Sequence, residues 1–361
     1  MLGLGFPSPR TPGGVYSMNN RTFTLTELAE YSGAKLIGDG TLQISGISTL
    51  QEATSSQLSF LANPQYRKYL SSTQAGAVIL DPREVQHYSG NCLSVPNPYA
   101  AYAKLTALFA GVVETEAKPG ASCVHPSAVV ADSAEIGQGV VIGANAVIES
   151  GAQLGDGVSI GAGCFVGEGT IIGDSSHLYA NVTVYGGIRI GQRCVFHSGV
   201  VIGADGFGFA PTDSGWVKIH HLAGVMIGDD VELGANTCVD RGALSDTVIE
   251  HGVKTDNMVQ IAHGVKIGAQ TVIAGCTAIA GSAEIGERCM IAGGVGIVGH
   301  ITIANGVTVT AMSLVTKSIK SAGSYSSGTP LTESQQWRRS AVRFGQLDEI
   351  YQRLRALESK K

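Results

Sequence analysis

The chain has 361 residues, of which 44% are hydrophobic, and its formal net charge is −5. That length predicts two or three globular units, and the lack of a basic run argues against a nucleic-acid partner. No window holds the roughly 18 uncharged apolar residues of a transmembrane segment. The seven cysteines lie singly, without CxxC pairs, which is typical of a cytoplasmic protein.

The first residues do not resemble a signal peptide, because prolines interrupt them and no long apolar core follows a charged segment. We expect residues 1–17 to be a disordered leader, with Met18 a candidate start. Residues 18–117 predict a separate α/β domain. Within it, "TFTLTELAEYSG" predicts a capped helix, "AGAVIL" a buried strand and "NPYAAYAKLTALFA" an amphipathic helix.

One segment of this domain, "LSFLANPQYRKYL", is a candidate ligand site. It places Phe60 at the end of a strand, with Asn63 as the N-cap and Pro64 in the first turn of a helix. A helix N-terminus flanked by aromatic rings suits a nucleotide or phosphate, because its free N–H groups favour anions. From these residues alone, however, ordinary core aromatics are the better explanation for Phe60 and Tyr66.

Residues 118–320 repeat with a period of six. Steps of six from Val124 to Ile202 always reach an aliphatic or aromatic residue. The register resumes at Ile227 and, after a slip of four residues, runs on to Val315 with Thr255 as its one departure. Glycine often follows these anchors, as expected at tight corners. The pattern is the hexapeptide repeat of a parallel β-helix. We therefore expect a mainly β protein with a left-handed parallel β-helix, the hand being that of known hexapeptide proteins.

Two segments interrupt the repeat. Residues 203–226, "GADGFGFAPTDSGWVKIHHLAGVM", are too long for one hexapeptide and must loop out of the β-helix. They carry two adjacent histidines, His220 and His221, and several aromatic residues. The slip near "LSDT" predicts a smaller bulge. A binding role and a plain surface excursion explain the long segment equally well.

The candidate chemistry centres on His263. Three hexapeptides make one coil, so residues separated by three hexapeptides stack, which places Gly281 over His263 and Gly299 over Gly281, with His300 next along the chain. The two histidines then share one face, roughly 10 Å apart. A base, a backbone N–H without a side chain and a second polar group are the parts that acyl transfer needs.

His263 has two other interpretations. A histidine that points outward from a β-helix is often simply solvated, although Asp256 and Asn257, just upstream, would be able to orient an imidazole. A metal site is not predicted, because His251 and His263 are separated by two hexapeptides and so fall on different faces of the coil.

The final segment, residues 321–361, predicts a helix or helical hairpin with a basic face. Its spacing brings Arg338, Arg339 and Arg343 near one another on that face. A docking site and a solvated helix that closes the β-helix both remain open for it.

Together these motifs resemble a known family. The order of "LSFLANPQYRKYL", "GANTCVDRGALSDTVI", "DNMVQIAHGVKIG", "GGVGIVGHITI" and "YSSGTPL" is similar to that of UDP-3-O-(3-hydroxyacyl)glucosamine N-acyltransferases of lipid A biosynthesis, over residues 20–361. The resemblance implies a homotrimer with active sites between adjacent β-helices. It implies transfer of an (R)-3-hydroxyacyl chain from the 4'-phosphopantetheine arm of acyl carrier protein to the 2-amine of a UDP-sugar, with no other cofactor.

The resemblance also assigns roles to residues. His263 matches the catalytic base, Gly281 the amide that stabilises the oxyanion and His300 the second active-site histidine. Asp256 and Asn257 match the residues beside the base.

Outside that cluster, Phe60, Asn63 and Tyr66 match the uridine pocket. Met312 and Leu314 fall where the family sets acyl length, and the position of Leu314 is often methionine there, which leaves the preferred chain open. The basic C-terminal segment would meet the acidic carrier protein. Two alternatives remain: the O-acyltransferase of the same pathway, which is shorter and lacks the N-terminal domain, and a non-catalytic trimeric scaffold.

Overall fold

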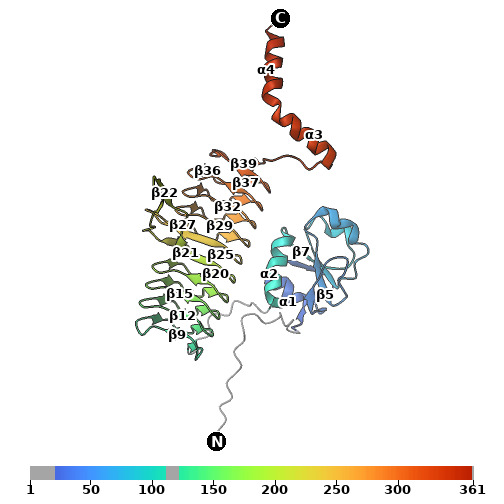
Figure 1. The fold of residues 1–361 in the computed structure, drawn as a ribbon. Coiled ribbons are helices and arrows are strands. Elements are labelled where there is room, and N and C mark those ends of the chain that lie inside the picture. The colour runs from blue at the N-terminus through green and yellow to red at the C-terminus, as the bar shows by residue number, and fades with distance from the viewer. Residues whose placement is uncertain (1–20, 111–121, 360–361) are drawn as a thin grey trace. The chain divides into compact units, whose positions relative to one another are not determined.

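The computed structural model describes residues 21–110 and 122–359 (Figure 1). The chain divides into two compact units, residues 1–118 and 119–361. The expected leader at residues 1–17, its candidate start at Met18 and the expected boundary at residue 117 lie outside the described residues.

A five-stranded sheet organises the first unit, in the order β2-β7-β6-β5-β4. Its strands are β2 (Lys35–Ile37), β4 (Gly46–Ile47), β5 (Gln57–Phe60), β6 (Ala77–Leu80) and β7 (Asn91–Ser94), and β1 (Phe23–Thr24) pairs separately with β3 (Gln43–Ile44). All four residues of β6 are buried, as expected for a parallel strand in the middle of a sheet. This confirms the buried strand predicted from "AGAVIL".

The two predicted helices of this unit are also confirmed. Helix α1 (Leu25–Ser32) begins at Thr24, whose side chain and that of Glu27 form a capping box, and ends at Gly33 with φ 71°. Helix α2 (Pro98–Ala110) packs on the same apolar cluster as α1. Short 3₁₀ helices, η1 (Pro64–Tyr69) and η2 (Val85–His87), complete the unit.

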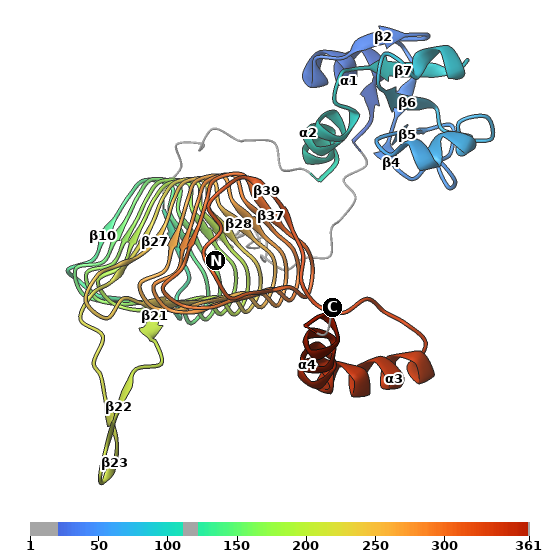
Figure 2. The same ribbon diagram turned by 90° about the horizontal axis from the view of Figure 1, so that it is seen from above.

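The second unit is a parallel β-helix. Its strands form three parallel sheets of nine, eleven and ten strands, and Figure 2 shows the coils stacked on one another. Pairs such as Glu135 with Gln153 and Gln260 with Ala278 are each separated by three hexapeptides, which confirms the predicted stacking. From Ile142 to Val315 the anchors point inward into one continuous core, where each buried aliphatic anchor contributes about 1.5–3 kcal/mol, whereas Val124 in the first coil is exposed.

The ten-stranded sheet positions the candidate site. Its strands are β9 (Val129–Val130), β12 (Val147–Ile148), β15 (Phe165–Val166), β18 (Thr183–Val184), β21 (Val201–Asp205), β26 (Cys238–Arg241), β29 (Gln260–Ile261), β32 (Ala278–Ile279), β35 (Gly296–Ile297) and β38 (Leu314–Val315).

The other two sheets complete each coil. The nine-stranded sheet comprises β10 (Glu135–Ile136), β13 (Gln153–Leu154), β16 (Ile171–Ile172), β19 (Arg189–Ile190), β24 (Val225–Ile227), β27 (Thr247–Ile249), β30 (Lys266–Ile267), β33 (Glu284–Ile285) and β36 (Thr302–Ile303). The eleven-stranded sheet comprises β8 (Cys123–Val124), β11 (Val141–Ile142), β14 (Ser159–Ile160), β17 (His177–Leu178), β20 (Val195–Phe196), β25 (Glu232–Leu233), β28 (Lys254–Thr255), β31 (Val272–Ile273), β34 (Met290–Ile291), β37 (Val307–Val309) and β39 (Gly323–Tyr325). The last strand lies past the expected end of the β-helix at residue 320, because it covers the edge of β37.

The long interruption leaves the β-helix as an antiparallel hairpin of β22 (Phe209–Thr212) and β23 (Gly215–Lys218), which projects from the coils in Figure 2. This confirms the predicted excursion, but it is shorter than residues 203–226, because β21 continues to Asp205 and β24 begins at Val225 in the coil. The chain returns in register, because Ile190 before the excursion pairs with Ile227 after it.

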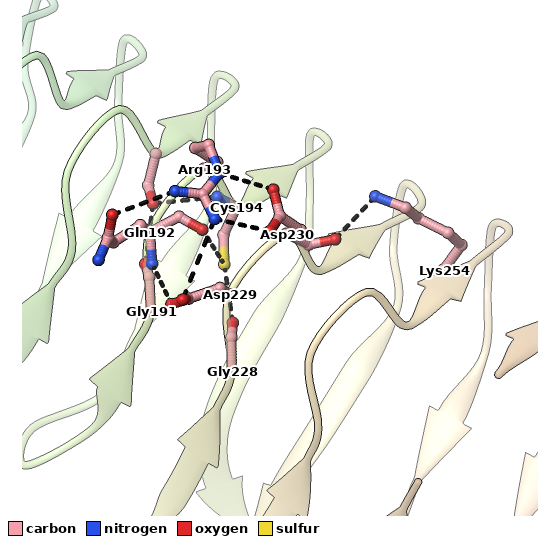
Figure 3. Close-up of polar contacts among 9 residues, drawn as sticks. Gly191, Gln192, Arg193, Cys194, Gly228, Asp229, Asp230 and Lys254 are labelled. Atoms are coloured by element: carbon pink, nitrogen blue, oxygen red, sulfur yellow. Dashed lines mark hydrogen bonds and ion pairs between the residues drawn. The ribbon is translucent and has the colours of Figure 1, made fainter. Parts of the chain in front are cut away.

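A polar cluster joins the two coils across this break (Figure 3). The guanidinium of Arg193 donates to both carboxylate oxygens of Asp230, on the far side of the excursion, at 2.7 Å each. Lys254 Nζ donates to the backbone oxygen of the same aspartate at 2.7 Å. These groups are about half exposed, so their contribution to stability is modest, and the register itself rests on the buried anchors.

The chain closes with two helices, α3 (Ser334–Gly345) and α4 (Leu347–Glu358), which confirm the predicted helical segment. They meet at Gln346. No side chain of either helix is buried, including Trp337 and Ile350, which are about half exposed.

Candidate active site

His263 lies in the turn that follows β29, and the glycine column predicted above it is present. Ser282 N donates to the backbone oxygen of His263 at 3.0 Å, and His300 N donates to the oxygen of Gly281 at 3.1 Å. The three turns after β29, β32 and β35 therefore stack directly, which brings His263, Gly281 and His300 onto one face.

The imidazole of His263 occupies space that only a glycine leaves open. A Cβ at position 281 would lie 2.6 Å from both Cε1 and Nε2 of His263. The φ angle of Gly281 is not in the left-handed region, so glycine is required here for close approach rather than for an unusual backbone. The Nε2 edge of the ring thus faces the backbone of Gly281.

The N–H of Gly281 is an available donor beside that ring edge. Among the described residues it makes no hydrogen bond, whereas Ala280 N donates to Ile297 and Ser282 N to His263. In another turn the N–H of Gln192 is capped by a carboxylate oxygen of Asp229. A base and an unpaired backbone donor side by side can remove a proton and stabilise an oxyanion.

Two residues expected to help the base do other work. Asp256 accepts hydrogen bonds from the backbone N–H groups of Asn257 at 2.8 Å and Gly275 at 3.0 Å, and the Asn257 side chain accepts from Ala235 N at 2.8 Å. They join coils in the turn before β29, while His263 lies in the turn after it. The strand between the two turns carries them to a different corner of the coil, so within one chain they form these contacts rather than a contact with the imidazole of His263.

The carboxylate that interacts with His263 belongs to Asp240 in β26. Asp240 Oδ2 accepts from Gln260 Nε2 at 3.0 Å, and burial raises the pKa of this carboxyl, while Gln260 and the nearby His263 and His221 lower it. The sequence did not single out Asp240, because the bulge near "LSDT" lies between it and His263 and shifts the count of hexapeptides.

His221, which the sequence left among the loop residues, contacts His263 directly. Its side chain comes from the return of the excursion and is 7% exposed. The two imidazole rings meet edge to face, with centroids 5.3 Å apart and planes at 74°. The repeat does not predict where a loop returns to the coil. The sequence therefore contains no sign of this contact beyond the presence of a histidine in the loop.

The bulge near "LSDT" reaches the same turn through Thr247. This fully buried side chain donates to the backbone oxygen of Asp240 at 2.7 Å and accepts from Gly264 N at 2.8 Å. Gly264 directly follows His263, so Thr247 holds the turn that carries the base.

The surroundings of His263 favour its neutral form. Burial is the main cause that lowers the pKa of the His263 imidazole. His221 and His300 lower this pKa further by charge repulsion, and Asp240 opposes them. A histidine with a lowered pKa is unprotonated at neutral pH and is available as a general base.

Met312 and Leu314 lie at the C-terminal end of the ten-stranded sheet, and their side chains are 77% and 59% exposed. Outward positions of successive strands in this sheet hold Ala278, Gly296 and then Leu314. A Cβ at Gly296 would lie 3.1 Å from Leu314 Cδ1. The two strands before Leu314 thus carry little side-chain volume at these outward positions.

The first unit contains a cavity of about 520 Å³ at the segment singled out from the sequence. Phe60, Asn63, Tyr66 and Tyr99 line it. Phe60 also stacks on Tyr102, with centroids 4.0 Å apart, so it serves both the core and the cavity. Tyr66 is 48% exposed and is not a core residue.

The expected anion site at this helix N-terminus is not present. The helix after Asn63 is the short 3₁₀ helix η1, and the Asn63 side chain caps Gln65 N at 3.0 Å. A short helix whose first donor is already used offers little to an anion, so this cavity is better suited to a flat ring held between aromatic side chains.

The three candidate docking arginines lie on α3. Arg338, Arg339 and Arg343 are exposed, and within the described part of the chain none of them forms an ion pair. Arg339 and Arg343 are one helical turn apart. Across the described ranges the structure has no helix long and apolar enough to span a membrane, and no cluster of three metal-ligating side chains.

Comparison with known proteins gives two matching family models. One, described as UDP-3-O-(3-hydroxymyristoyl) glucosamine N-acyltransferase, matches residues 41–108. The other, the bacterial transferase hexapeptide model of six repeats, matches residues 133–168 and 169–204. The two models fall on the two compact units separately.

Curated relatives match almost the whole chain. UDP-3-O-acylglucosamine N-acyltransferase of Pseudomonas fluorescens SBW25 is 55% identical over 94% of this chain and 95% of its own length. The enzyme of the same name from Pseudomonas aeruginosa UCBPP-PA14 is 54% identical over 95% of this chain and 96% of its own. A solved Arabidopsis UDP-N-acetylglucosamine acyltransferase covers 56% of this chain and 71% of its own, at 22% identity and a TM-score of 0.49. The curated relatives show that this chain belongs to the UDP-3-O-acylglucosamine N-acyltransferase family.

Proposed function

We propose that this enzyme transfers an (R)-3-hydroxyacyl chain from acyl carrier protein to the 2-amine of UDP-3-O-acylglucosamine, in the cytoplasm, as a step of lipid A synthesis. Family membership supports the acyltransferase activity and the UDP-sugar substrate. The observation that carries the mechanism is the close approach of the His263 imidazole to the backbone of Gly281, whose N–H makes no hydrogen bond among the described residues.

In the proposed reaction the amine nitrogen attacks the thioester carbonyl, and His263 Nε2 takes the proton that the amine loses. The Gly281 N–H donates to the oxyanion that forms. When the tetrahedral intermediate collapses, the C–S bond breaks and the 4'-phosphopantetheine thiolate leaves with the proton returned by His263. His300, on the same face, is proposed to contact substrate. No metal, other cofactor or covalent enzyme intermediate is required for this balance.

The active form is proposed to be a homotrimer with sites between adjacent β-helices. Outward apolar side chains on the eleven-stranded sheet support this arrangement, because Val141, Val272 and Met290 are each between 42% and 55% exposed. Exposed apolar residues on a sheet face are typical of surfaces that a second copy covers. Sedimentation equilibrium of the full chain tests the stoichiometry.

One assay decides among the candidate functions. Purified protein is incubated with (R)-3-hydroxyacyl carrier protein and 3-O-acylated UDP-glucosamine, and the product is analysed by mass for a new amide. A parallel reaction offers UDP-N-acetylglucosamine as acceptor. Ester formation on that sugar would favour the O-acyltransferase alternative, and no product with either acceptor would favour a non-catalytic scaffold.

The aromatic cavity of the first unit is proposed to hold the uridine. Phe60→Ala and Tyr66→Ala should each weaken UDP-sugar binding about tenfold by removing a stacking surface, with donor KM little changed. Isothermal titration with UDP measures this. Tyr31→Ala removes a comparably exposed tyrosine on α1 and is the control. Equal losses for donor and acceptor would argue against a uridine site.

Leu314 and Met312 are proposed to limit the acyl chain. Replacing Leu314 with phenylalanine should shift preference toward shorter donors by about 1–3 kcal/mol, because the larger ring takes up more of the open space beside Gly296, where no side chain lies. Competition between carrier-protein donors of different length measures the shift. Leu331→Phe, at a fully exposed leucine, is the control. An unchanged preference for donor length would show that Leu314 does not limit the acyl chain.

The arginines of α3 are proposed to dock the acidic carrier protein. Reversing Arg338, Arg339 and Arg343 to glutamate should raise the KM for the carrier-protein donor, since opposite charges attract at long range. Added salt should do the same to the wild type. The UDP-sugar KM in the same variant is the internal control. Unaltered donor kinetics in a variant that stays trimeric would leave these helices as structural elements.

A further inference from the structure

The ring of His263 is enclosed by two glycines, not one. Gly281 faces its Nε2 edge, and a Cβ at Gly206 in the excursion would lie 3.1 Å from both Cβ and Cδ2 of His263. The same Cβ would lie 3.1 Å from Nε2 of His221. The excursion therefore approaches the base closely enough that a side chain at position 206 would separate the two imidazoles.

His221 brings an unusual polar atom to this slot. Its Nδ1 lies 3.2 Å from the backbone oxygen of Ile219, and because a carbonyl only accepts, Nδ1 is the nitrogen that carries the hydrogen. In the neutral ring Nε2 then carries a lone pair and no hydrogen. That atom is buried and has no hydrogen-bond partner among the described residues.

A buried polar atom without a partner is costly, at about 1–3 kcal/mol, so its retention beside the base calls for a reason. Holding the hairpin to the β-helix is not a sufficient one, because an apolar side chain in the same place would do that without the penalty. Adjacent His220 is exposed, which shows that the chain turns one histidine of the pair outward and the other inward.

Charged neighbours surround the two rings on several sides. Asp240 and His300 face His263, from β26 and from the turn after β35. Asp240 also faces His221, as does Asp205 at the end of β21, which forms an ion pair with Lys218 at 2.6 Å. Within this set, each imidazole is the other's ring-contact partner. Two positively charged rings with centroids 5.3 Å apart repel, and more strongly where they are partly buried than in water.

We propose that His221 is a positioning residue for His263: its buried ring forms one wall of the slot, and its contact with the base opposes a second positive charge there. The excursion at residues 203–226 is then part of the catalytic machinery. This proposal rests on the proposed function only for the role of His263 as the base.

The test is a pair of measurements on the full-length protein. Histidine labelled with ¹³C at Cε1 reports the protonation of His263 by NMR without any substrate. Burial and the charge of His221 both lower the pKa of His263. His221→Ala lets water into the slot and removes that charge, so the titration midpoint of His263 should rise by about one pH unit. His220→Ala, which changes the exposed neighbour, should leave the midpoint in place.

Kinetics give the second readout. At a pH where His263 is neutral in all variants, His221→Ala should lower kcat about tenfold with little change in KM, because the ring of the base loses a wall. His221→Phe refills that wall and should return kcat to within about threefold of the wild type. If circular dichroism shows that His221→Ala does not fold, His221→Gln replaces it, since glutamine is polar but does not titrate.

The outcomes separate the two ideas. An unchanged His263 midpoint in an active His221→Ala enzyme, or an equal shift from His220→Ala, would overturn the positioning role. If His221→Ala lowers kcat but leaves the titration midpoint of His263 unchanged, His221 has a structural role only and the proposed coupling of the two rings is wrong. A shifted midpoint in a protein that transfers no acyl group would support the coupling of the rings and overturn the proposed function instead.

Discussion

His263→Ala is expected to lower kcat for amide formation by at least about 10²-fold, because the amine then has no general base. The fold should remain, since the imidazole lies in a surface slot and no core anchor is removed. The rate is measured with saturating hydroxyacyl carrier protein and UDP-3-O-acylglucosamine, and the fold by thermal melting. The wild-type rate should fall as pH drops through the lowered pKa of His263, and this acid limb should vanish in the variant.

The chain offers a matched control for this substitution. His251 lies in the sequence "EHGV", as His263 lies in "AHGV", and each is followed by a glycine with φ near 70° or 67°. His251→Ala therefore makes the same chemical change in the same kind of turn on another face of the β-helix, and should leave kcat unaltered. A near-normal rate for His263→Ala, or a large fall in its melting temperature, would contradict the assignment of the base.

The second large effect is expected for Gly281→Ala, which should reduce kcat by roughly 10²-fold. The added Cβ would lie 2.6 Å from Cε1 and Nε2 of His263, so the ring must move away from the N–H beside it. The backbone N–H itself is kept, and the φ of Gly281 is one that alanine tolerates. The loss therefore tests the close approach of ring and backbone rather than the donor alone.

A double-mutant cycle makes this prediction specific. In the His263→Ala background there is no ring to displace, so the added methyl group should cost much less than it does in the wild type. The rates of the four proteins are compared under one set of conditions. Fully additive losses would show that Gly281→Ala acts away from His263, for example by disturbing the stacking of the coils.

The two breaks in the repeat meet at the base. The excursion delivers His221 to one side of His263, and the bulge delivers Thr247, which joins the backbone of Asp240 to that of Gly264. The regular coils need neither element, because they pair and bury their anchors without them. Departures from an otherwise uniform repeat are thus concentrated where the proposed chemistry takes place.

The sequence alone determined the β-helix and the column of His263, Gly281 and His300. A period of six and a coil of three hexapeptides form a local rule, so the count along the chain is also a map of which residues stack. The capped helix α1 and the buried strand β6 were predictable for a similar reason, since capping and burial patterns are short-range. The segment around Phe60 was a candidate ligand site for which core aromatics were the better explanation from the sequence, and a cavity lies there.

Only the tertiary structure decided the surroundings of the base. Asp256 is close to His263 in sequence but lies in a different turn, because each strand of the coil carries the chain to a new corner. Asp240 and His221 are farther away in sequence and interact with it, because the excursion and the bulge return to the coil at places that no period specifies. Where a repeat is broken, contacts depend on how a non-repeating loop packs, and that packing is settled by burial and hydrogen bonding in three dimensions.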